Sequence, residues 1–241
     1  MCALSYVRMK ALILAGGFGK RLRPYTESIP KPLLEVAGKP IMIWQFEWLR
    51  KYGIDEVIVC AGYLKEKIIE KVGNGSRYSI KAGYVIEEEP LGKGGAIKNA
   101  EHLLKSEDSF LVVNGDVLTD INPKRLFESL GGDTIGSIAV TPLPSPYGIV
   151  EYRKDDFVVT AFREKPKLKD YWINAGVYAF TRDIFDYLPE RGEVEERTFP
   201  QLANRGALVA VEYPDALWIS VDSHKDLEEA AKAISRPHAN A

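Results

Sequence analysis

The sequence is poor in cysteine and histidine, and it carries almost no net charge. Its 241 residues include two cysteines and three histidines, and the formal net charge is -2. Two cysteines make no disulfide framework, and Cys60 lies in an apolar segment that predicts a small core residue. The scattered histidines show neither zinc-ligand spacing nor the arrangement of a Ser-His-Asp triad. A near-neutral chain has no general affinity for polyanions, so we expect no nucleic-acid partner.

Long apolar runs are also missing from the sequence. No stretch reaches the roughly 20 apolar residues of a membrane-spanning helix, and residues 1–8 lack the apolar segment of a signal peptide. We therefore expect a cytoplasmic protein with no membrane partner. Because Met9 offers a natural start, residues 1–8 are interpreted as an N-terminal extension and residues 236–241 as a short tail.

The sequence is 46% apolar and 27% charged, which is the composition of an ordinary folded domain. In the first half, strand patterns alternate with helix patterns. The predicted strands cover residues 10–14, 56–61, 80–87 and 110–114, and the predicted helices cover 41–52, 65–72 and 95–105. This alternation predicts a largely parallel sheet, in which ligands bind beyond the carboxyl ends of the strands.

The second half is richer in β-branched and aromatic residues. Its predicted strands cover residues 135–141, 148–152, 157–164 and 172–180, and its predicted helices cover 181–188, 195–205 and 224–235. We expect antiparallel members here, shaped as a lid or a substrate-binding half. The whole is predicted to be one α/β domain over residues 9–235, with halves of about 9–134 and 135–235.

Residues 15–32, AGGFGKRLRPYTESIPKP, carry the most informative pattern. Gly16, Gly17 and Gly19 let the backbone bend sharply and approach a ligand closely. Four cationic residues surround this bend: Lys20, Arg21, Arg23 and Lys31. Bare backbone N–H groups beside cationic side chains bind anions. The loop is therefore predicted to hold nucleotide phosphates.

Two common glycine-rich motifs do not fit this loop. A P-loop needs four residues between its glycines, then Lys and Ser or Thr. Here Gly16 and Gly19 are too close, and Arg21 follows Lys20. A dinucleotide fingerprint needs a third glycine three residues after the second, where this chain has Leu22.

Three charged residues are predicted to face the phosphates. Prolines on both sides of Lys31 fix the backbone around its ammonium group. Asp116 follows the strand at 110–114, where a hard oxygen ligand beside a phosphate site favours Mg²⁺; a capping or turn aspartate is the alternative. Asp222 follows a strand at 217–221 and is the candidate second ligand, with helix N-cap as an equal alternative.

Shorter motifs point to a second substrate. Glu164 and Lys165, before a proline, can grip a sugar hydroxyl and an adjacent phosphate. The Asn174 amide both donates and accepts hydrogen bonds, while Gly148 and Gly176 permit close approach of a ligand. A plain turn or bulge is the alternative for each motif.

A second glycine-rich loop, residues 91–96, precedes a predicted helix. Its glycines, among them Gly92 and Gly95, either begin that helix or form a wall on which a nucleobase lies. The sequence pattern leaves both possibilities open.

Together these motifs resemble the signature of the sugar-1-phosphate nucleotidylyltransferases, also called NDP-sugar pyrophosphorylases. The long motif at 16–26 and the Pro-Lys-Pro at 30–32 are the most specific. The shorter motifs follow in the family's order at 90–96, 114–116, 147–148, 164–166 and 174–176. The resemblance implies the nucleotide-diphospho-sugar transferase fold, a Rossmann-like mixed, mainly parallel sheet with helices on both faces. Residues 9–134 would form its nucleotide-binding half and 135–235 its sugar-binding half.

The resemblance also implies Mg²⁺-dependent transfer of a nucleoside monophosphate from an NTP to a sugar 1-phosphate, with release of pyrophosphate. Hexose- or heptose-1-phosphate guanylyltransferases, such as the mannose enzyme, are similar, and uridylyl-, thymidylyl- and cytidylyltransferases are further alternatives. A catalytically silent sugar-nucleotide-binding subunit is the runner-up, and an enzyme acting on phosphocholine is a third interpretation. Retention of Arg21, Lys31, Asp116 and Lys165 argues for an enzyme. Relatives are commonly homo-oligomers.

Site roles follow from the resemblance position by position. The catalytic cations would be Arg21 and Lys31 on the nucleotide phosphates and Lys165 on the sugar phosphate, with Asp116 and Asp222 binding Mg²⁺. The nucleotide-binding residues would be Ala15, Gly16, Gly17, Gly19, Lys20, Gly92 and Gly95. The sugar-binding residues would be Gly148, Glu164, Asn174 and Gly176. Many members have Asp-Ile-Gly-Thr where residues 220–223 read Ser-Val-Asp-Ser, which predicts a metal aspartate displaced by two positions.

Overall fold

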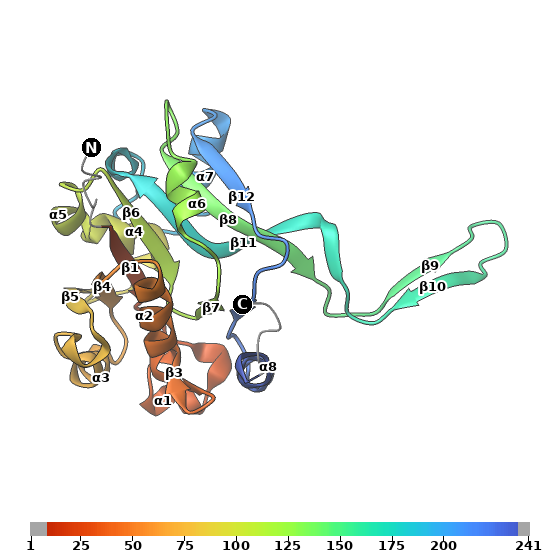
Figure 1. Ribbon diagram of the computed structural model, residues 1–241, viewed down its shortest axis with the longest axis horizontal. Helices are drawn as coiled ribbons and strands as arrows, with labels where there is room; N and C mark the ends of the chain where they lie inside the picture. The colour runs from red at the N-terminus through yellow and green to blue at the C-terminus, as the bar shows by residue number, and fades with distance from the viewer. Residues whose placement is uncertain (1–8, 236–241) are drawn as a thin grey trace, which may run out of the picture.

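A seven-stranded mixed sheet forms the centre of the molecule, in the order β12-β8-β11-β6-β1-β4-β5 (Figure 1). We describe residues 9–235 from a computed structural model; the predicted extension at 1–8 and tail at 236–241 lie outside the described residues. The strands are β1 (Lys10–Ala15), β4 (Glu56–Ala61), β5 (Lys81–Ile86), β6 (Ser109–Asn114), β8 (Gly136–Pro144), β11 (Lys167–Thr181) and β12 (Leu208–Glu212). Strands β6, β1, β4 and β5 are parallel neighbours, β12 is parallel to β8, and β11 is antiparallel to both β6 and β8. The predicted mixed, mainly parallel sheet is confirmed.

Alternate side chains of the central strands enter two different cores, as the two-residue period of a strand requires. In β1, Ala11 and Ile13 belong to one core and Leu12 to the other, which also contains the fully buried Cys60. The first core is closed by α2 (Ile41–Lys51), α3 (Lys65–Val72) and α6 (Lys124–Glu128). The second is closed by α4 (Gly92–Asn99), α5 (Glu101–Leu104) and α7 (Thr198–Asn204). Helices therefore cover both faces of the sheet, as predicted.

A third apolar cluster connects segments that are far apart in the sequence. It packs the 3₁₀ turn η1 (Lys20–Leu22), β2 (Glu35–Val36), β7 (Val117–Thr119) and α8 (His224–Ile234) against one another. Strand β7 also pairs antiparallel with β13 (Trp218–Ser220). The residues just after β6 and just before α8 are consequently held beside the glycine-rich loop.

Several boundaries differ from the sequence prediction. The helix predicted over 95–105 is two helices that meet at Ala100, and the first begins at Gly92. The helix predicted over 181–188 is a 3₁₀ segment, η4 (Arg182–Asp186). Strand β11 begins at Lys167, ahead of the strand predicted over 172–180, because its first residues pair with the end of β8. The remaining elements are α1 (Tyr25–Ser28), η2 (Lys31–Leu33), β3 (Lys39–Pro40) and η3 (Ser76–Tyr78). No helix within residues 9–235 combines the length and the apolar character needed to cross a bilayer.

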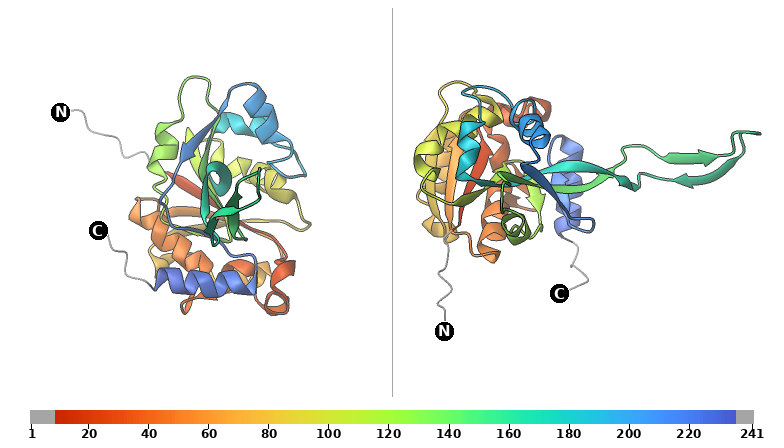
Figure 2. Two further views of the ribbon diagram at one scale, coloured as in Figure 1. Left: turned by 90° about the vertical axis from the view of Figure 1, so that its right-hand side faces the viewer. Right: turned by 90° about the horizontal axis from the view of Figure 1, so that it is seen from above.

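The extensions of β8 and β11 lead into a long arm that projects from the body of the molecule (Figures 1 and 2). At its end, β9 (Ile149–Tyr152) and β10 (Val159–Arg163) form a separate antiparallel hairpin. The register between β11 and β8 shifts between Leu168 and Trp172, and such irregularities bend a strand. The antiparallel members expected in the second half are therefore present, and the arm into which they lead extends outward from the body of this chain.

Candidate active site

A cavity of about 460 Å³ opens at the carboxyl ends of β1 and β6, the edge where the parallel sheet was predicted to bind its ligand. The glycine-rich loop, the start of α4 and the segment after β6 line it. Ten predicted site residues lie in its wall: Ala15, Gly16, Gly17, Gly19, Lys20, Arg21, Lys31, Gly92, Asp116 and Asp222. The other six, Gly95, Gly148, Glu164, Lys165, Asn174 and Gly176, are outside this lining.

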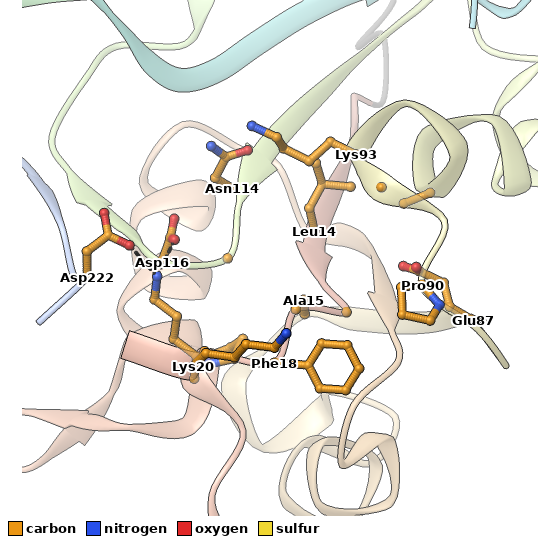
Figure 3. Close-up of a pocket in the computed structure, with 18 of the residues that line it drawn as sticks. Leu14, Ala15, Phe18, Lys20, Glu87, Pro90, Lys93, Asn114, Asp116 and Asp222 are labelled. Carbon is orange, nitrogen blue, oxygen red and sulfur yellow. Dashed lines mark hydrogen bonds and ion pairs between the residues drawn. The ribbon is translucent and has the colours of Figure 1, made fainter. Parts of the chain in front are cut away.

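Lys31 occupies the centre of the charged end of the cavity. Its Nζ lies 2.5 Å from Asp116 Oδ2 and 2.8 Å from Asp222 Oδ1, so it holds the two carboxylates together. Figure 3 shows Asp116 and Asp222 next to each other at this end of the cavity. Arg21 Nη2 also donates to Asp222 Oδ1, at 2.7 Å. The Lys31 side chain is 14% exposed and that of Arg21 is 75% exposed. Lys31 is thus fixed in place, while Arg21 has its guanidinium open to a ligand.

The loop geometry around Lys31 depends on Gly19. This glycine adopts φ +60°, and a Cβ added to it would lie 2.9 Å from Thr26 Cγ2 and 3.3 Å from Lys31 Cβ. Thr26 Oγ1 donates to Gly19 O at 2.9 Å, which closes the turn. A side chain at position 19 would therefore be strained by the backbone and would crowd the lysine.

The N-cap of α8 is Ser223, not Asp222. Ser223 and Asp226 form a reciprocal capping box, in which each side chain accepts the other's backbone N–H. The Asp222 carboxylate is left to accept hydrogen bonds from Ser220 Oγ, at 3.0 Å, and from Lys31 and Arg21. Burial would raise the pKa of Asp222, but these contacts outweigh burial and hold the pKa below its ordinary value. Asp222 is therefore a carboxylate at neutral pH.

The donor set of Asp116 and Asp222 fits a magnesium ion. Mg²⁺ prefers oxygen ligands and is usually held by one or two carboxylates together with substrate phosphates and water. Within residues 9–235 no group of three or more acidic, histidine or cysteine side chains is arranged to hold a metal. An ion at these two aspartates would therefore take its remaining ligands from substrate phosphate oxygens and water.

Glu87 lies at the other side of the cavity, away from the two aspartates (Figure 3). It is 8% exposed, and Leu91 N–H donates to its Oε2 at 3.2 Å. Burial raises the pKa of Glu87, and the hydrogen bond from Leu91 opposes that shift only in part. A Cβ added to Gly16 would lie 2.6 Å from Glu87 Oε1, so the carboxylate needs glycine at position 16. The sequence prediction missed Glu87, although it ends a predicted strand.

The second glycine-rich loop forms the first turn of α4 and packs against residues 189–192. Gly94 N–H donates to Gly192 O at 2.9 Å. A Cβ on Gly95 would lie 2.6 Å from Glu190 O, so Gly95 is required by this packing and faces away from the cavity. Of the two predicted base-binding glycines, only Gly92 lines the cavity.

Lys93, which follows Gly92, is also paired. Its Nζ contacts Glu195 and lies 3.9 Å from Glu193, which itself lines the cavity. Lys93 thus connects the start of α4 to the segment before α7.

Asn174 and Gly176 lie on β11 directly behind the cavity wall. Asn174 Oδ1 accepts from Gly176 N–H, and its Nδ2 donates to Tyr178 Oη, both at 2.9 Å. A Cβ on Gly176 would lie 2.5 Å from Nδ2 of Asn114, a residue that lines the cavity. Asn114 Oδ1 is buried and accepts no hydrogen bond from the described residues, which leaves it available to a hydroxyl donor.

Glu164 and Lys165 lie on the arm and do not reach the cavity of their own chain. Their side chains are 64% and 51% exposed, and the charged atoms are 3.9 Å apart. Gly148, on the same arm, packs against Phe162 and Glu164. Of the three predicted catalytic cations, Arg21 and Lys31 therefore line the cavity of their own chain together with Asp116, and Lys165 does not.

Residues 10–236 match the nucleotidyl transferase family. The chain belongs to this family. It is 36% identical over 226 residues to the mannose-1-phosphate guanylyltransferase catalytic subunit beta of Xenopus tropicalis, and 37% identical over 228 residues to the subunit of that name from Dictyostelium discoideum. Each alignment covers 90% of this chain and 62% of the relative, so the chain spans less than two thirds of their length.

Two solved proteins have the same fold as this chain. HddC from Yersinia pseudotuberculosis superposes with a TM-score of 0.75 at 30% identity, over 94% of this chain and 99% of HddC. A second structure of HddC is a complex with GMP-PN. A UDP-glucose pyrophosphorylase complexed with UDP-glucose superposes with a TM-score of 0.71 at 21% identity, over 94% of this chain and 98% of that one, a likeness of fold alone. The nucleotide-diphospho-sugar transferase fold expected from the sequence is confirmed.

Proposed function

We propose that this chain catalyses Mg²⁺-dependent transfer of GMP from GTP to a sugar 1-phosphate, with mannose 1-phosphate the first acceptor to test. One observation carries the proposal. A single cavity joins a lysine-bridged pair of aspartates at one side to a buried glutamate at the other. The first side suits a triphosphate and the second a base. The mannose-1-phosphate guanylyltransferase relatives and the HddC complex with GMP-PN support this assignment.

The phosphate side supplies charge and position. The two substrates bring roughly six negative charges together, and their repulsion must be cancelled before one phosphate can attack the other. Arg21 is open to the triphosphate, and Lys31 is held where the α-phosphate would lie. A bound Mg²⁺, held by Asp116 and Asp222, would offset the charge of the phosphate oxygens. The attacking sugar phosphate oxygen is already ionised near neutral pH, so no general base is needed.

The base side favours guanine because Glu87 presents acceptors only. An ionised carboxylate accepts two hydrogen bonds side by side and donates none. Guanine offers two adjacent donors, its ring N1–H and its exocyclic amino group, whereas uracil and thymine offer one donor flanked by carbonyl oxygens. Replacing a required donor by an acceptor leaves a buried polar group unpaired, which costs about 1–3 kcal/mol. Glu87 therefore selects GTP over UTP and dTTP.

The acceptor would lie towards β11 and the arm. We assign its sugar hydroxyls to Glu164, Asn174 and the backbone near Gly148 and Gly176, and its phosphate to Lys165. Asn114, with its free Oδ1, is a further candidate to bind a hydroxyl.

A grid of four NTPs against a panel of sugar 1-phosphates tests the proposal, with pyrophosphate release as the readout. We expect Mg²⁺-dependent release with GTP and one or a few hexose or heptose 1-phosphates. Phosphocholine is included as an acceptor of a different class. Binding of GDP-sugar without any pyrophosphate release would instead identify a silent regulatory subunit.

A further inference from the structure

The cavity of one chain has no surplus of positive charge with which to hold its second substrate. Its lining contains four cations, Lys20, Arg21, Lys31 and Lys93, and four carboxylates, Glu87, Asp116, Asp222 and Glu193. Three of these cations, Arg21, Lys31 and Lys93, already pair with carboxylates of the same chain. Because a triphosphate and a sugar phosphate bring roughly six negative charges, the lined cavity and one divalent ion leave the charge uncancelled. A cationic group from outside this lining is needed.

Such a group is present where the arm begins. Residues 163–169 read REKPKLK and carry four cations against one carboxylate. Within this segment Lys165 adopts φ +45°, a left-handed conformation that is uncommon for lysine, and a proline follows it. A strained backbone persists only when its surroundings hold it, and it is typical of functional positions. The chain thus presents an exposed ammonium group on the arm, outside its own cavity.

The arm also exposes an unusual amount of apolar surface. Nine of the thirteen exposed large apolar side chains in the described residues lie on it: Tyr147, Val150, Tyr152, Phe157, Val158, Val159, Phe162, Tyr171 and Trp172. An isolated two-stranded hairpin is at best marginally stable in water, and large exposed apolar patches mark interaction surfaces. The hairpin therefore needs a surface to cover it, and the outward pairing of β8 with β11 directs it away from its own body (Figure 2).

We propose that two copies of this chain exchange arms, so that each hairpin packs on the other copy and each Lys165 completes the other copy's active site. This inference rests on the proposed function. A second copy of this chain is the partner indicated. Its cavity becomes negatively charged when GTP is bound, and the cations of residues 163–169 would offset that charge. A twofold axis makes the exchange reciprocal, so both sites are completed and both hairpins are covered by one arrangement.

Mixing two inactive variants tests this directly. Arg21→Ala removes a cation of the cavity whose side chain is 75% exposed. Lys165→Ala removes the cation of the arm. In a mixed dimer, the Lys165→Ala chain has an intact cavity and receives an intact arm from the Arg21→Ala chain. After the chains have been allowed to exchange, we expect the mixture to recover about a quarter of wild-type turnover, because half of the dimers are mixed and one of their two sites works.

The outcomes separate this inference from the proposed function. Wild-type chain that releases no pyrophosphate contradicts the function itself. Active wild type with a mixture no better than its components shows that each arm serves its own chain and overturns the exchange. Near-normal turnover by Lys165→Ala alone, or a wild type that sediments as a monomer at assay concentration, overturns it too. Lys154→Ala, at the exposed tip of the hairpin, is the matched control and is expected to retain wild-type turnover.

Discussion

Lys31 and Glu87 lie on opposite sides of the cavity and carry opposite charges when both are ionised. Lys31 is a cation whose charge two aspartates share, so its ammonium has a fixed position. Glu87 is a carboxylate in a largely buried place, hydrogen-bonded by one backbone N–H. The prolines around Lys31 made the fixed position of its ammonium predictable from the sequence. Glu87 could not be predicted in this way, because its role depends on Gly16 and Leu91, which the fold brings to it.

Lys31→Ala is expected to lower turnover by roughly a hundredfold or more, the scale of losing one charge-stabilising contact in the transition state. The measurement is kcat for pyrophosphate release at saturating GTP and acceptor. Lys39→Ala is the matched control, since Lys39 also stands beside a proline but pairs with Glu47 and does not line the cavity. Turnover of Lys31→Ala close to that of the control would contradict the role of Lys31.

Glu87→Gln is expected to lower the preference for GTP over UTP by roughly ten- to a hundredfold, because the amide keeps the shape but loses one acceptor. The ratio of kcat/KM for the two nucleotides measures this preference. Glu88→Gln is the neighbouring control, because the Glu88 side chain is 82% exposed and pairs with Lys65. An unchanged ratio in Glu87→Gln would contradict the proposal that Glu87 selects the base.

The raised pKa of Glu87 predicts a pH dependence of stability. Because burial raises the pKa of Glu87 above its ordinary value of 4.5, the folded chain holds the Glu87 proton more tightly than the unfolded chain does. The group's contribution to stability therefore falls as pH rises from about 4.5 through the raised pKa. Glu87→Gln removes that loss, so the variant should melt higher than wild type at pH 7 and not at pH 4. Equal melting differences at both pH values would contradict burial as the cause.

At the scale of elements, the sequence predicted those helices and strands whose residues show a clear local periodicity. Strands β1 and β4 and helices α2 and α3 were predicted within a residue or two, because buried strands and amphipathic helices have clear periods. Strand β7 is three residues long and is defined by pairing with β13, about a hundred residues away. The outward extension of β11 likewise depends on β8. Pairing with a distant strand does not show in the local sequence, so β7 and the extension of β11 could not be predicted from it.

The start of α8 joins local sequence to the site, because its capping box immediately follows Asp222. Ser223→Ala removes the capping oxygen and is expected to lower the stability of the fold by about 1 kcal/mol. Thermal denaturation should show a fall in melting temperature of about 2–4 °C for a chain of this size. Ser235→Ala, at the other end of α8, is expected to leave the melting temperature nearly unchanged. A larger effect at Ser235 than at Ser223 would be inconsistent with the observed cap.

At the scale of the whole molecule, the fold brings together what the sequence keeps apart. Lys31 is 85 positions from Asp116 and 191 positions from Asp222 in the sequence, yet the three residues form one charged cluster. The direction of parallel strands made the meeting of Lys31 with Asp116 predictable. Asp222 is positioned by β13 and the third apolar cluster, which only the folded chain reveals. The position of Lys165 was not predictable, since it depends on where the arm goes.

Binding at this cluster should also be visible in the stability of the whole chain. A ligand at 100 times its Kd stabilises a folded protein by about 2.7 kcal/mol, which for a chain of this size raises the melting temperature by about 5–10 °C. We expect that shift with GTP and Mg²⁺ together and a smaller one with GTP and a chelator. In Asp116→Asn the difference between the two conditions should disappear, because one of the two carboxylates that would hold the ion is neutral. If the variant keeps the full Mg²⁺-dependent shift, the ion is bound elsewhere and Asp116 serves only to hold Lys31.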